Sequence, residues 1–442
     1  MSMEVGRMKK LMVLFLASIL LLAACSTKTP ESKPSDDGKD KGSDGKETEE
    51  LTVWAWDMNF NVAALNIALE GYKADHPDAN FKIIENAQDD IVQKLNTGLS
   101  SGTQKGLPNI VLIEDYRAQS FLQAYPDAFY ELSDVFNEDD FAEYKLAPTS
   151  LDGKNYGIPF DTGVTGLYVR TDYLAEAGYT VEDMQNIDWR EYVEIGKKVK
   201  EATGKDFVTI DPSDLGIVRI MIQSAGSWYT KEDGVTPNLA DNAALKEALE
   251  VYKAMLDANI VKPNSDWGEF LANFNNGSVA TVPTGNWITP SIKAEASQSG
   301  LWAVVPIPKL NVSEAVNASN LGGSSWYVLD IPGAEQAADF LGKTFGSDVE
   351  LYQKLITEIG AIGTYKPASE GTAYALEDEF FGGQTVISDF ATWTEDIIGI
   401  NYGMHTYAID DIVAVEMQNY INGKDINEVL NDAQKQAEAQ FK

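Results

Sequence analysis

Carboxylates and tryptophans that follow apolar segments are the residues of this 442-residue chain best suited to chemistry. Asp57 follows Trp56 after the apolar run LTVWA, and Glu114 and Asp115 stand in tandem after the run IVLI. Two carboxylates that flank a glycosidic bond can hydrolyse it, one as the acid and one as the base or nucleophile. The same groups can instead accept hydrogen bonds from a bound molecule. At this point the residues leave both kinds of chemistry open.

The composition excludes several other kinds of chemistry. The chain contains two histidines, His76 and His405, and one cysteine, Cys25. These are too few for a structural zinc site, a disulfide framework or a cysteine–histidine pair. We therefore predict no catalytic metal and no cofactor. A structural calcium ion stays open, because the many Asp residues are scattered and form no EF-hand loop.

Acidic residues dominate the charge. Lys and Arg total 34 against 68 Asp and Glu, which gives a net charge of −34. Most of the surface would repel a phosphate backbone, so nucleic acid is not expected as a partner. With 44% hydrophobic residues, the chain is long enough for about two to three domains with their own cores.

The first residues predict an export signal. Arg7, Lys9 and Lys10 precede an apolar run from Leu11 to Ala24. A basic start followed by such a run is typical of a secretory signal peptide, and the run is too short to span a membrane as a helix. We predict a signal peptide over residues 1–24.

The end of this run, Leu22-Ala23-Ala24-Cys25, resembles the lipobox of bacterial lipoproteins. The resemblance implies a diacylglycerol on the thiol of Cys25, which anchors the protein to the outer face of the cell membrane. The alternative is an ordinary signal or an uncleaved anchor with a buried thiol. Residues 26–50 carry no aromatic or branched aliphatic side chain, so they bury too little apolar surface to offset ordering entropy. We predict a flexible tether over residues 25–50.

From Leu51 onward, short apolar runs alternate with amphipathic stretches, which is typical of an α/β fold. The pattern predicts strands in the runs 51–56, 80–85 and 108–113. The last run is apolar on both faces, as in a central strand of a parallel sheet covered by helices. Ligands of such sheets bind beyond the carboxyl ends of the strands, the position of the acidic and aromatic residues described first.

A second unit follows the segment YGIPFDTG at 156–163, where Gly and Pro interrupt the apolar pattern. In it, the stretch 242–258 carries apolar residues at spacings of three and four, which predicts a helix with Asp241 as its N-cap. Near the end of the chain, Asp425 predicts the N-cap of another helix, with Glu428 three positions on.

Five strings connect the chain to a family. VWAWDMNFN, GKNYGIPFDTGVTGLYVRTDYLAEAGY, VATVPTGNWI, NLGGSSWYVL and INYGMHTY occur in this order from about residue 51. Together with the lipobox they resemble the extracellular carbohydrate-binding lipoproteins of ATP-binding-cassette (ABC) importers. The resemblance is greatest to the maltodextrin, lactose and arabinose-type branch.

The resemblance implies a fold, a division of the chain and partners. The fold is the two-lobed α/β fold of type II periplasmic binding proteins, whose hinge segments let the lobes close over a sugar. Lobe one would comprise 51–160 and 301–346, and lobe two 161–300 and 347–442, with crossings at YGIPFD, near Gly300 and near Gly346. The partners would be a carbohydrate and the transmembrane subunits of an ABC permease, and we expect a monomer.

The resemblance also implies a sugar site, in which carboxylates and amides bind the hydroxyl rim and flat aromatics stack on the C–H face. Trp287, in TGNWI, matches the motif that carries a stacking tryptophan on the second lobe. Asp161 stands where maltodextrin-type members place a Glu, so its reach and the preferred sugar stay open. Tyr402 and His405 fall on a ligand-facing segment. The candidate sugar-binding residues are Trp56, Asp57, Asn59, Glu114, Asp115, Asp161, Trp228, Trp287, Gly323, Ser324, Tyr402 and His405.

Each candidate also has a purely structural interpretation. A tryptophan such as Trp228 can be a core side chain. Asp57, Asn59 and Asp161 suit turns or caps, and one of the tandem acids can serve only to cap the following helix. The glycines of NLGGSSW suit a plain turn, and a histidine such as His405 can be a structural residue with satisfied hydrogen bonds.

The sequence therefore predicts a lipid-anchored carrier that captures a mono- or oligosaccharide outside the cell and catalyses no reaction. Two alternatives belong to other classes. Acidic side chains with aromatic neighbours also suit ammonium groups, so the protein can instead be a binder of a cationic solute such as a polyamine. The second alternative is a secreted glycosidase that uses the carboxylates for catalysis.

Overall fold

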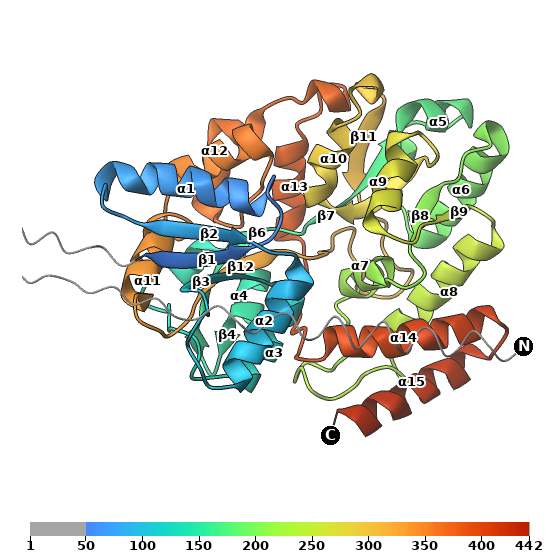
Figure 1. Ribbon diagram of the computed structural model, residues 1–442. Helices are drawn as coiled ribbons and strands as arrows, with labels where there is room; N and C mark the ends of the chain where they lie inside the picture. Colours follow the sequence, from blue (N-terminus) through green and yellow to red (C-terminus); the bar gives the residue numbers. More distant parts are fainter. Residues whose placement is uncertain (1–49, 442) are drawn as a thin grey trace, which may run out of the picture. The chain divides into compact units, whose positions relative to one another are not determined.

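The computed structural model describes residues 50–441 (Figure 1). The predicted signal peptide, the Cys25 lipid and the predicted tether as far as residue 49 lie outside the described residues. Within the described part, no helix combines the length and apolar character needed to cross a membrane.

The first lobe is built on a five-stranded sheet in the order β2-β1-β3-β12-β6. Strand β1 pairs in parallel with β2 and β3, as the sequence predicts, whereas β12 runs antiparallel to both β3 and β6. The strands are β1 (Leu51–Ala55), β2 (Phe81–Glu85), β3 (Ile110–Glu114), β6 (Gly157–Asp161) and β12 (Ser324–Val328).

Strand β3 shows why this sheet is covered on both faces. Ile110 and Leu112 pack in a core with residues of α1, whereas Val111 and Ile113 point the other way and pack against α2 and α3. Figure 1 shows α1 on one face and α2 and α3 on the other. The helices packed around this sheet are α1 (Asn61–Asp75), α2 (Gln88–Ser100), α3 (Asp115–Ala124), α4 (Glu143–Thr149), α11 (Ala334–Lys343) and α12 (Val349–Ile359).

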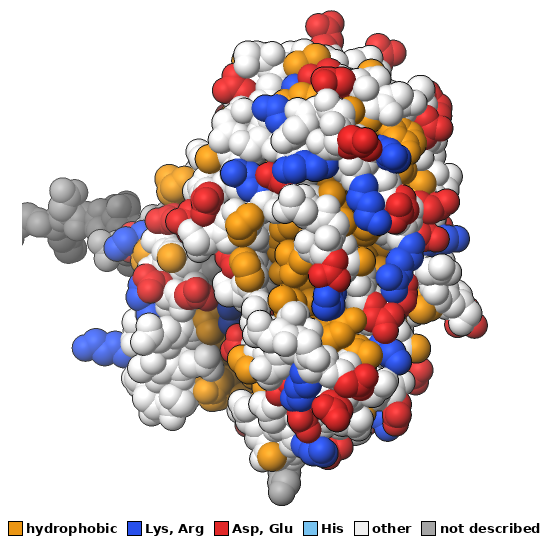
Figure 2. Space-filling model, turned by 90° about the vertical axis from the view of Figure 1, so that its right-hand side faces the viewer, with side chains coloured by type: hydrophobic (Ala, Val, Ile, Leu, Met, Phe, Trp, Pro, Cys, Tyr) orange, Lys and Arg blue, Asp and Glu red, His pale blue; other side chains and the backbone are white. Residues whose placement is uncertain are grey.

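The second lobe is built on an antiparallel three-stranded sheet, β10-β7-β11, and a parallel pair, β8 and β9. The strands are β7 (Thr165–Arg170), β8 (Val208–Ile210), β9 (Val261–Pro263), β10 (Thr281–Gly285) and β11 (Trp302–Pro306). Its helices are α5 (Thr171–Glu176), α6 (Trp189–Thr203), α7 (Gly216–Ser224), α8 (Ala243–Asp257), α9 (Trp267–Asn275), α10 (Thr289–Lys293), α14 (Thr406–Ile421) and α15 (Ile426–Gln440). Acidic side chains are spread among basic ones on the face shown in Figure 2.

Two segments without helix or strand connect the sheets, and they are hydrogen-bonded to each other where they pass between the lobes. The first runs from β6 to β7, and the second from β11 to β12. The amide of Leu321 donates to the carbonyl of Gly163 at 2.8 Å, and the amide of Thr165 donates to the carbonyl of Ser319 at 2.9 Å. The lobes are thus joined by a paired hinge.

The strand pairing differs from the expected lobe boundaries. A return near Gly300 was expected, but β11 pairs with β7 in the second sheet, so the chain returns to the first sheet only after Pro306. A third crossing was expected near Gly346, but α12, which follows it, packs against α1 of the first lobe. The next helix, α13 (Val386–Glu395), reaches the second lobe, where Phe390 packs on Tyr168. Apolar periodicity reports that a segment is buried but not against which sheet, so it could not locate these crossings.

One helix N-cap lies where the sequence predicts it, and another lies one residue further along the chain. Asp425 accepts hydrogen bonds from the amides of Asn427 and Glu428 and caps α15, as predicted. At α8 the predicted cap, Asp241, is exposed, and the cap is Asn242, whose Oδ1 accepts from the amide of Leu245 at 2.9 Å. The side-chain amide nitrogen of Asn242 also donates to the backbone carbonyl of Trp228. The buried side chain of Asn242 therefore bonds backbone groups on both sides, whereas the side chain of Asp241 is exposed.

These neighbouring positions give a matched pair of variants. Asn242→Ala removes the cap and the bond to Trp228, so we expect the free energy of unfolding in urea to fall by about 2 kcal/mol. Asp241→Ala should change it by less than about 0.5 kcal/mol. An equal loss in both variants would show that Asn242 is not the cap.

Candidate functional site

A cavity of about 900 Å³ opens between the carboxyl ends of the first-lobe strands and the second lobe. Eight of the predicted residues line it. They are Trp56, Asp57 and Asn59 after β1, Glu114 after β3, Asp161 at the end of β6, Gly323 and Ser324 before and at the start of β12, and Trp287 on the second lobe.

Asp161 lies at the floor of this cavity, where the first sheet ends. Its Oδ1 accepts hydrogen bonds from the amide and the hydroxyl of Ser324, at 2.8 and 2.6 Å. Burial raises the pKa of Asp161, and both the positive charge of Lys145 and the hydrogen bonds from Ser324 oppose the rise. The carboxyl group is therefore held in place before any ligand arrives.

Asp115 does not face the cavity, in contrast to the prediction. Its side chain is buried beneath the floor, where Oδ2 lies 2.5 Å from Nζ of the fully buried Lys145, and Oδ1 accepts from the hydroxyl of Ser325. Lys145 also donates to the carbonyl of Ser324. Burial raises the pKa of Asp115 to about 6 against the opposing effect of Lys145. Asp115 begins α3, which turns its side chain inward, whereas Glu114 ends β3 and reaches the cavity.

Glu114 connects the two lobes. Both of its carboxylate oxygens accept from the hydroxyl of Tyr407 on α14, at 2.8 and 2.7 Å. The guanidinium of Arg117 lies 4.2 Å from the centre of the Tyr407 ring. Burial raises the pKa of Glu114, while the bond from Tyr407 and the charge of Arg117 lower it. Glu114 is thus an ordered acceptor at the cavity wall.

Asp57 lines the cavity, as predicted, and also forms a turn, which was its alternative interpretation. It has a left-handed backbone conformation, with φ 61°, and its Oδ1 accepts from the amides of Asn59 and Phe60. The residue therefore forms the turn after β1 and lines the cavity at the same time.

Arg219 contributes a buried cation to the cavity wall. Its Nη1 lies 2.5 Å from Asp410, and its Nη2 lies 2.7 Å from Asp214. Among the described residues its Nε has no hydrogen-bond partner. The guanidinium is therefore fixed in the cavity wall by two carboxylates.

Aromatic rings form the second-lobe wall. The indole nitrogen of Trp287 donates to the carbonyl of Leu321 at 2.9 Å, which fixes the ring against the hinge. Trp267, at the start of α9, is 54% exposed and lies 5.8 Å from Trp287 between ring centres. The wall thus carries two indoles, of which the sequence predicted one.

Three other predicted residues lie outside this cavity. Trp228 and Tyr402 are buried in the second core, where both pack against Tyr116. The indole of Trp228 donates to Thr406, so its alternative interpretation as a core side chain is confirmed. His405 stacks on Phe441 at 4.2 Å, and burial lowers its pKa. Tyr116 itself lines the cavity, so Trp228 and Tyr402 support the cavity wall from behind.

The sequence analysis missed several residues of the cavity. For Arg219 a signal was present, because a single charge within the apolar helical run GIVRIMI is unusual unless it is paired. Tyr407 ends the string INYGMHTY, which was assigned a ligand-facing role through Tyr402 and His405, whereas no comparable local signal marked Trp267. The missed residues with polar or aromatic side chains are Phe60, Asn61, Gln88, Tyr116, Asp214, Arg219, Trp267, Ser291 and Tyr407.

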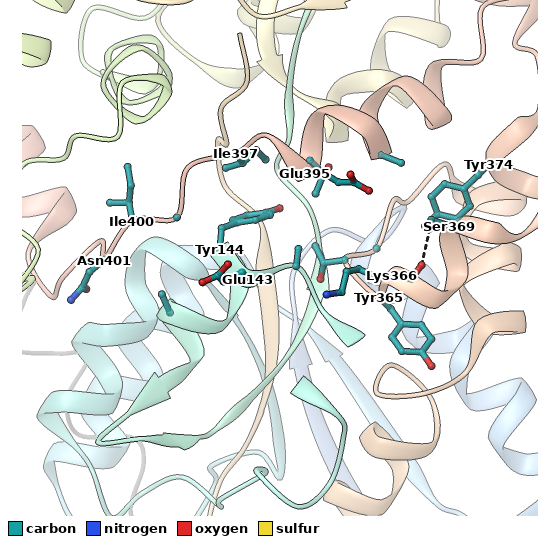
Figure 3. Close-up of a pocket in the computed structure, with 17 residues that line it drawn as sticks. Glu143, Tyr144, Tyr365, Lys366, Ser369, Tyr374, Glu395, Ile397, Ile400 and Asn401 are labelled. Carbon is teal, nitrogen blue, oxygen red and sulfur yellow. Dashed lines mark hydrogen bonds between the residues drawn. The ribbon is translucent and has the colours of Figure 1, made fainter. Parts of the chain in front are cut away.

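A second cavity, of about 620 Å³, lies between α4 and the segment after α13 (Figure 3). Tyr144, Tyr365 and Tyr374 line it, but each ring is at most 7% exposed and presents little face to a ligand. Ser369 donates to the carbonyl of Lys366 at its edge. None of the predicted residues lines this cavity, so the cavity between the lobes is the candidate site.

A two-lobed α/β fold with a polar and aromatic cavity at the hinge defines a solute-binding protein. The chain belongs to the bacterial extracellular solute-binding protein family, whose model matches residues 68–381. The family and the two-lobed fold expected from the sequence are thus confirmed.

The similar proteins include sugar binders. The chain is 46% identical to a lactose-binding protein of Rhizobium radiobacter over 393 residues, which cover 89% of this chain and 93% of the relative. It is 24% identical to an arabinooligosaccharide-binding protein of Halalkalibacterium halodurans, with 90% and 91% covered. The fold matches an ABC transporter associated binding protein of B. animalis subsp. lactis, solved with beta-1,6-galactobiose, with a TM-score of 0.72, 22% identity and 89% and 98% covered.

The buried pair beneath the floor gives a testable prediction. Lys145→Met leaves the carboxylate of Asp115 buried without its cation, so the free energy of unfolding should fall by about 3–5 kcal/mol. Adding Asp115→Leu removes the second charge and should recover part of this loss. Lys154→Met breaks an exposed pair with Glu131, which solvent screens, and should cost much less than Lys145→Met. Equal losses for Lys145→Met and Lys154→Met in urea unfolding would contradict a stabilising role of the buried pair.

Proposed function

We propose that this protein binds a disaccharide or oligosaccharide in the cavity between its lobes and delivers it to the permease of an ABC importer. The observation that carries the proposal is the pairing of indole faces, Trp56 and Trp287, with fixed hydrogen-bonding groups, Asp161, Glu114 and Arg219. Sugars present apolar C–H faces and rims of hydroxyls, and this cavity offers a partner for each. The similarity to a lactose-binding protein supports the same ligand class.

Ligand binding would shift the equilibrium from the open form of the protein toward the closed form. In the open form one lobe holds the sugar, and contacts from the other lobe then favour closure, because the ligand has a higher affinity for the closed form. The first lobe would contribute Asp161 and Ser324, and the second Trp287 and Arg219. The permease would recognise the closed form.

A cationic ligand fits the cavity less well than a neutral one. Glu114 already bonds Tyr407 and lies close to Arg117, and Asp161 bonds Ser324. On the same wall the carboxylate of Asp214 is already paired with Arg219. These contacts reduce the attraction for an ammonium group, whereas hydroxyls can still use the remaining lone pairs of the carboxylates.

The protein would act as a carrier without catalysing a reaction, which fits a family of binding proteins. It would be a monomer, held at the outer face of the membrane by a lipid on Cys25. This location rests on the lipobox of the sequence and on the extracellular character of the family.

Thermal unfolding with a ligand panel tests the proposal. Ligands that bind the native state raise the melting temperature by mass action. We expect lactose, maltose or arabinose-type oligosaccharides to raise it and polyamines to leave it unchanged. Trp287→Ala and Asp161→Ala should each weaken sugar binding by about tenfold or more, because each removes a stacking face or a fixed acceptor.

Val415→Ala serves as the control, because Val415 is exposed on α14 and does not line the cavity. A rise with polyamines alone would contradict the sugar assignment. Release of reducing ends from oligosaccharides, lost in Asp161→Asn or Glu114→Gln, would show an enzyme instead of a carrier.

A further inference from the structure

Tyr116 belongs to one lobe by its backbone and to the other by its side chain. It lies near the start of α3, whose later residues Ala118, Phe121 and Leu122 pack in the core of the first lobe. The ring of Tyr116, in contrast, is 2% exposed and is part of the core of the second lobe. A side chain of the first lobe is thus inserted into the second.

The ring is received by aromatic side chains of the second lobe. The ring of Trp228 lies 5.3 Å away between centres, and the ring of Tyr402 lies 4.6 Å away in an edge-to-face arrangement. We call these two residues the socket. Withdrawing Tyr116 from the socket would expose its ring to water, give up two aromatic contacts and leave a void in the second core. The ring is therefore expected to stay in the socket when the lobes rotate.

The socket adjoins the paired hinge. The hydroxyl of Tyr116 donates to the carbonyl of Asn320 at 3.1 Å. Asn320 stands between Ser319 and Leu321, the two residues through which the second hinge segment pairs with the first. Its Oδ1 also accepts from the amide of Gly163 at 3.1 Å. The hinge and the socket are two places at which the lobes hold each other, and a rotation that preserves both has the line between them as its axis.

The main cavity has one edge close to this line. There α3 contacts α14, the hydroxyl of Tyr407 bonds both carboxylate oxygens of Glu114, and the guanidinium of Arg117 covers the Tyr407 ring. The ring of Tyr407 lies 6.3 Å from that of Tyr116. We call this the α3/α14 edge. The bond between Glu114 and Tyr407 is short and close to the axis, so a rotation of the lobes moves its two ends little.

The opposite edge of the cavity is held less firmly. Here α1 and α9 line the cavity from different lobes, and we call this the α1/α9 edge. Both helices lie in the upper half of the view in Figure 1, whereas α3 and α14 lie in the lower half. Within residues 50–441, no hydrogen bond or ion pair joins α1 to α9. This edge can open without breaking such a bond.

We propose that Tyr116 is the pivot of lobe closure, so that the cavity opens and closes at the α1/α9 edge while the α3/α14 edge stays closed. The pivot rests on the proposed function, in which a sugar closes the lobes. A sugar then enters and leaves between α1 and α9. Glu114 keeps its bond to Tyr407 in the open form and meets the sugar in an orientation that closure does not change.

Distances between pairs of spin labels test the pivot. Cys25 is the only cysteine of the chain, so Cys25→Ser gives a full-length background for labelling. One pair, Ala124→Cys with Asp411→Cys, spans the α3/α14 edge. The other, Asn66→Cys with Ala272→Cys, spans the α1/α9 edge. All four residues are exposed, and none of them lines the cavity.

The two label pairs should respond differently to a sugar. Lactose, maltose and arabinotriose are each added to the labelled protein. A sugar that binds should shorten the distance between Asn66 and Ala272 by more than about 2 Å, because these helices lie far from the axis. It should leave the distance between Ala124 and Asp411 unchanged. Without a sugar, the distance distribution of the α1/α9 pair should be the broader of the two.

Two variants of α3 form a matched comparison. Tyr116→Leu removes the ring from the socket, so the distance distribution across the α3/α14 edge should broaden and should shift when a sugar binds. Phe121→Leu is the control, because Phe121 is also an aromatic residue of α3 that is 2% exposed, but it packs within the first lobe. This variant should lose stability and keep the narrow distribution.

The outcomes separate the pivot from the function on which it rests. Equal shifts of both distances on sugar binding would contradict the pivot, and so would a folded Tyr116→Leu whose α3/α14 distribution is as narrow as that of Phe121→Leu. If Tyr116→Leu does not fold, the distances without it decide. If no sugar changes either distance or the melting temperature, the proposed function fails. The sugar-free distributions still test the pivot in that case, because an α3/α14 distribution as broad as the α1/α9 distribution would overturn it.

Discussion

The ion pair between Lys145 and Asp115 is the contact on which the floor of the cavity depends. It joins α4 to the start of α3, and through the bonds to the Ser324 carbonyl and the Ser325 hydroxyl it also holds the start of β12. Gly323 passes so close that a Cβ at this position would lie 3.0 Å from Asp115 and 3.2 Å from Lys145, with φ at 84°. The glycine that the sequence suggested as a ligand contact is therefore required first by the packing. Ser324 then fixes Asp161, so the buried pair sets the geometry of a carboxylate that it does not touch.

The electrostatics of the cavity differ from those of the whole chain. The net charge of −34 would suggest a site for cations. In the cavity, however, the acidic groups already accept hydrogen bonds, from Ser324 at Asp161, from Tyr407 at Glu114, from backbone amides at Asp57 and from Arg219 at Asp214. Such groups are fixed acceptors whose orientation costs nothing further when a ligand binds. Because Arg219 is likewise paired with Asp214 and Asp410, the cavity offers fixed acceptors that suit the hydroxyls of a neutral polyol.

The sequence predicted the α/β order of the first lobe and much of the cavity, because strand ends and motifs are local features. Trp287 and Asp161 were found in this way. Trp228 and Tyr402 were misplaced because the residue that covers them, Tyr116, lies far away in the sequence. The sequence could not decide whether Glu114 or Asp115 faces the cavity, since this depends on which of the two residues begins α3. In the string INYGMHTY the residue that lines the cavity is Tyr407 and not Tyr402 or His405, because the start of α14 decides which side chain faces the hinge, and only tertiary packing brings Trp267 on α9 there.

The paired hinge has a mechanical consequence for recognition. Hydrogen bonds between the segments around Gly163 and Leu321 keep register as long as the two segments do not slide past one another. Bending of the hinge changes backbone torsions gradually and keeps these bonds. Sliding of one segment along the other would break all of them at once, so the lobes can rotate toward each other more easily than they can slide past each other. The two walls then approach along an arc without lateral offset. The width of a bound molecule then sets how far along this arc the walls can approach.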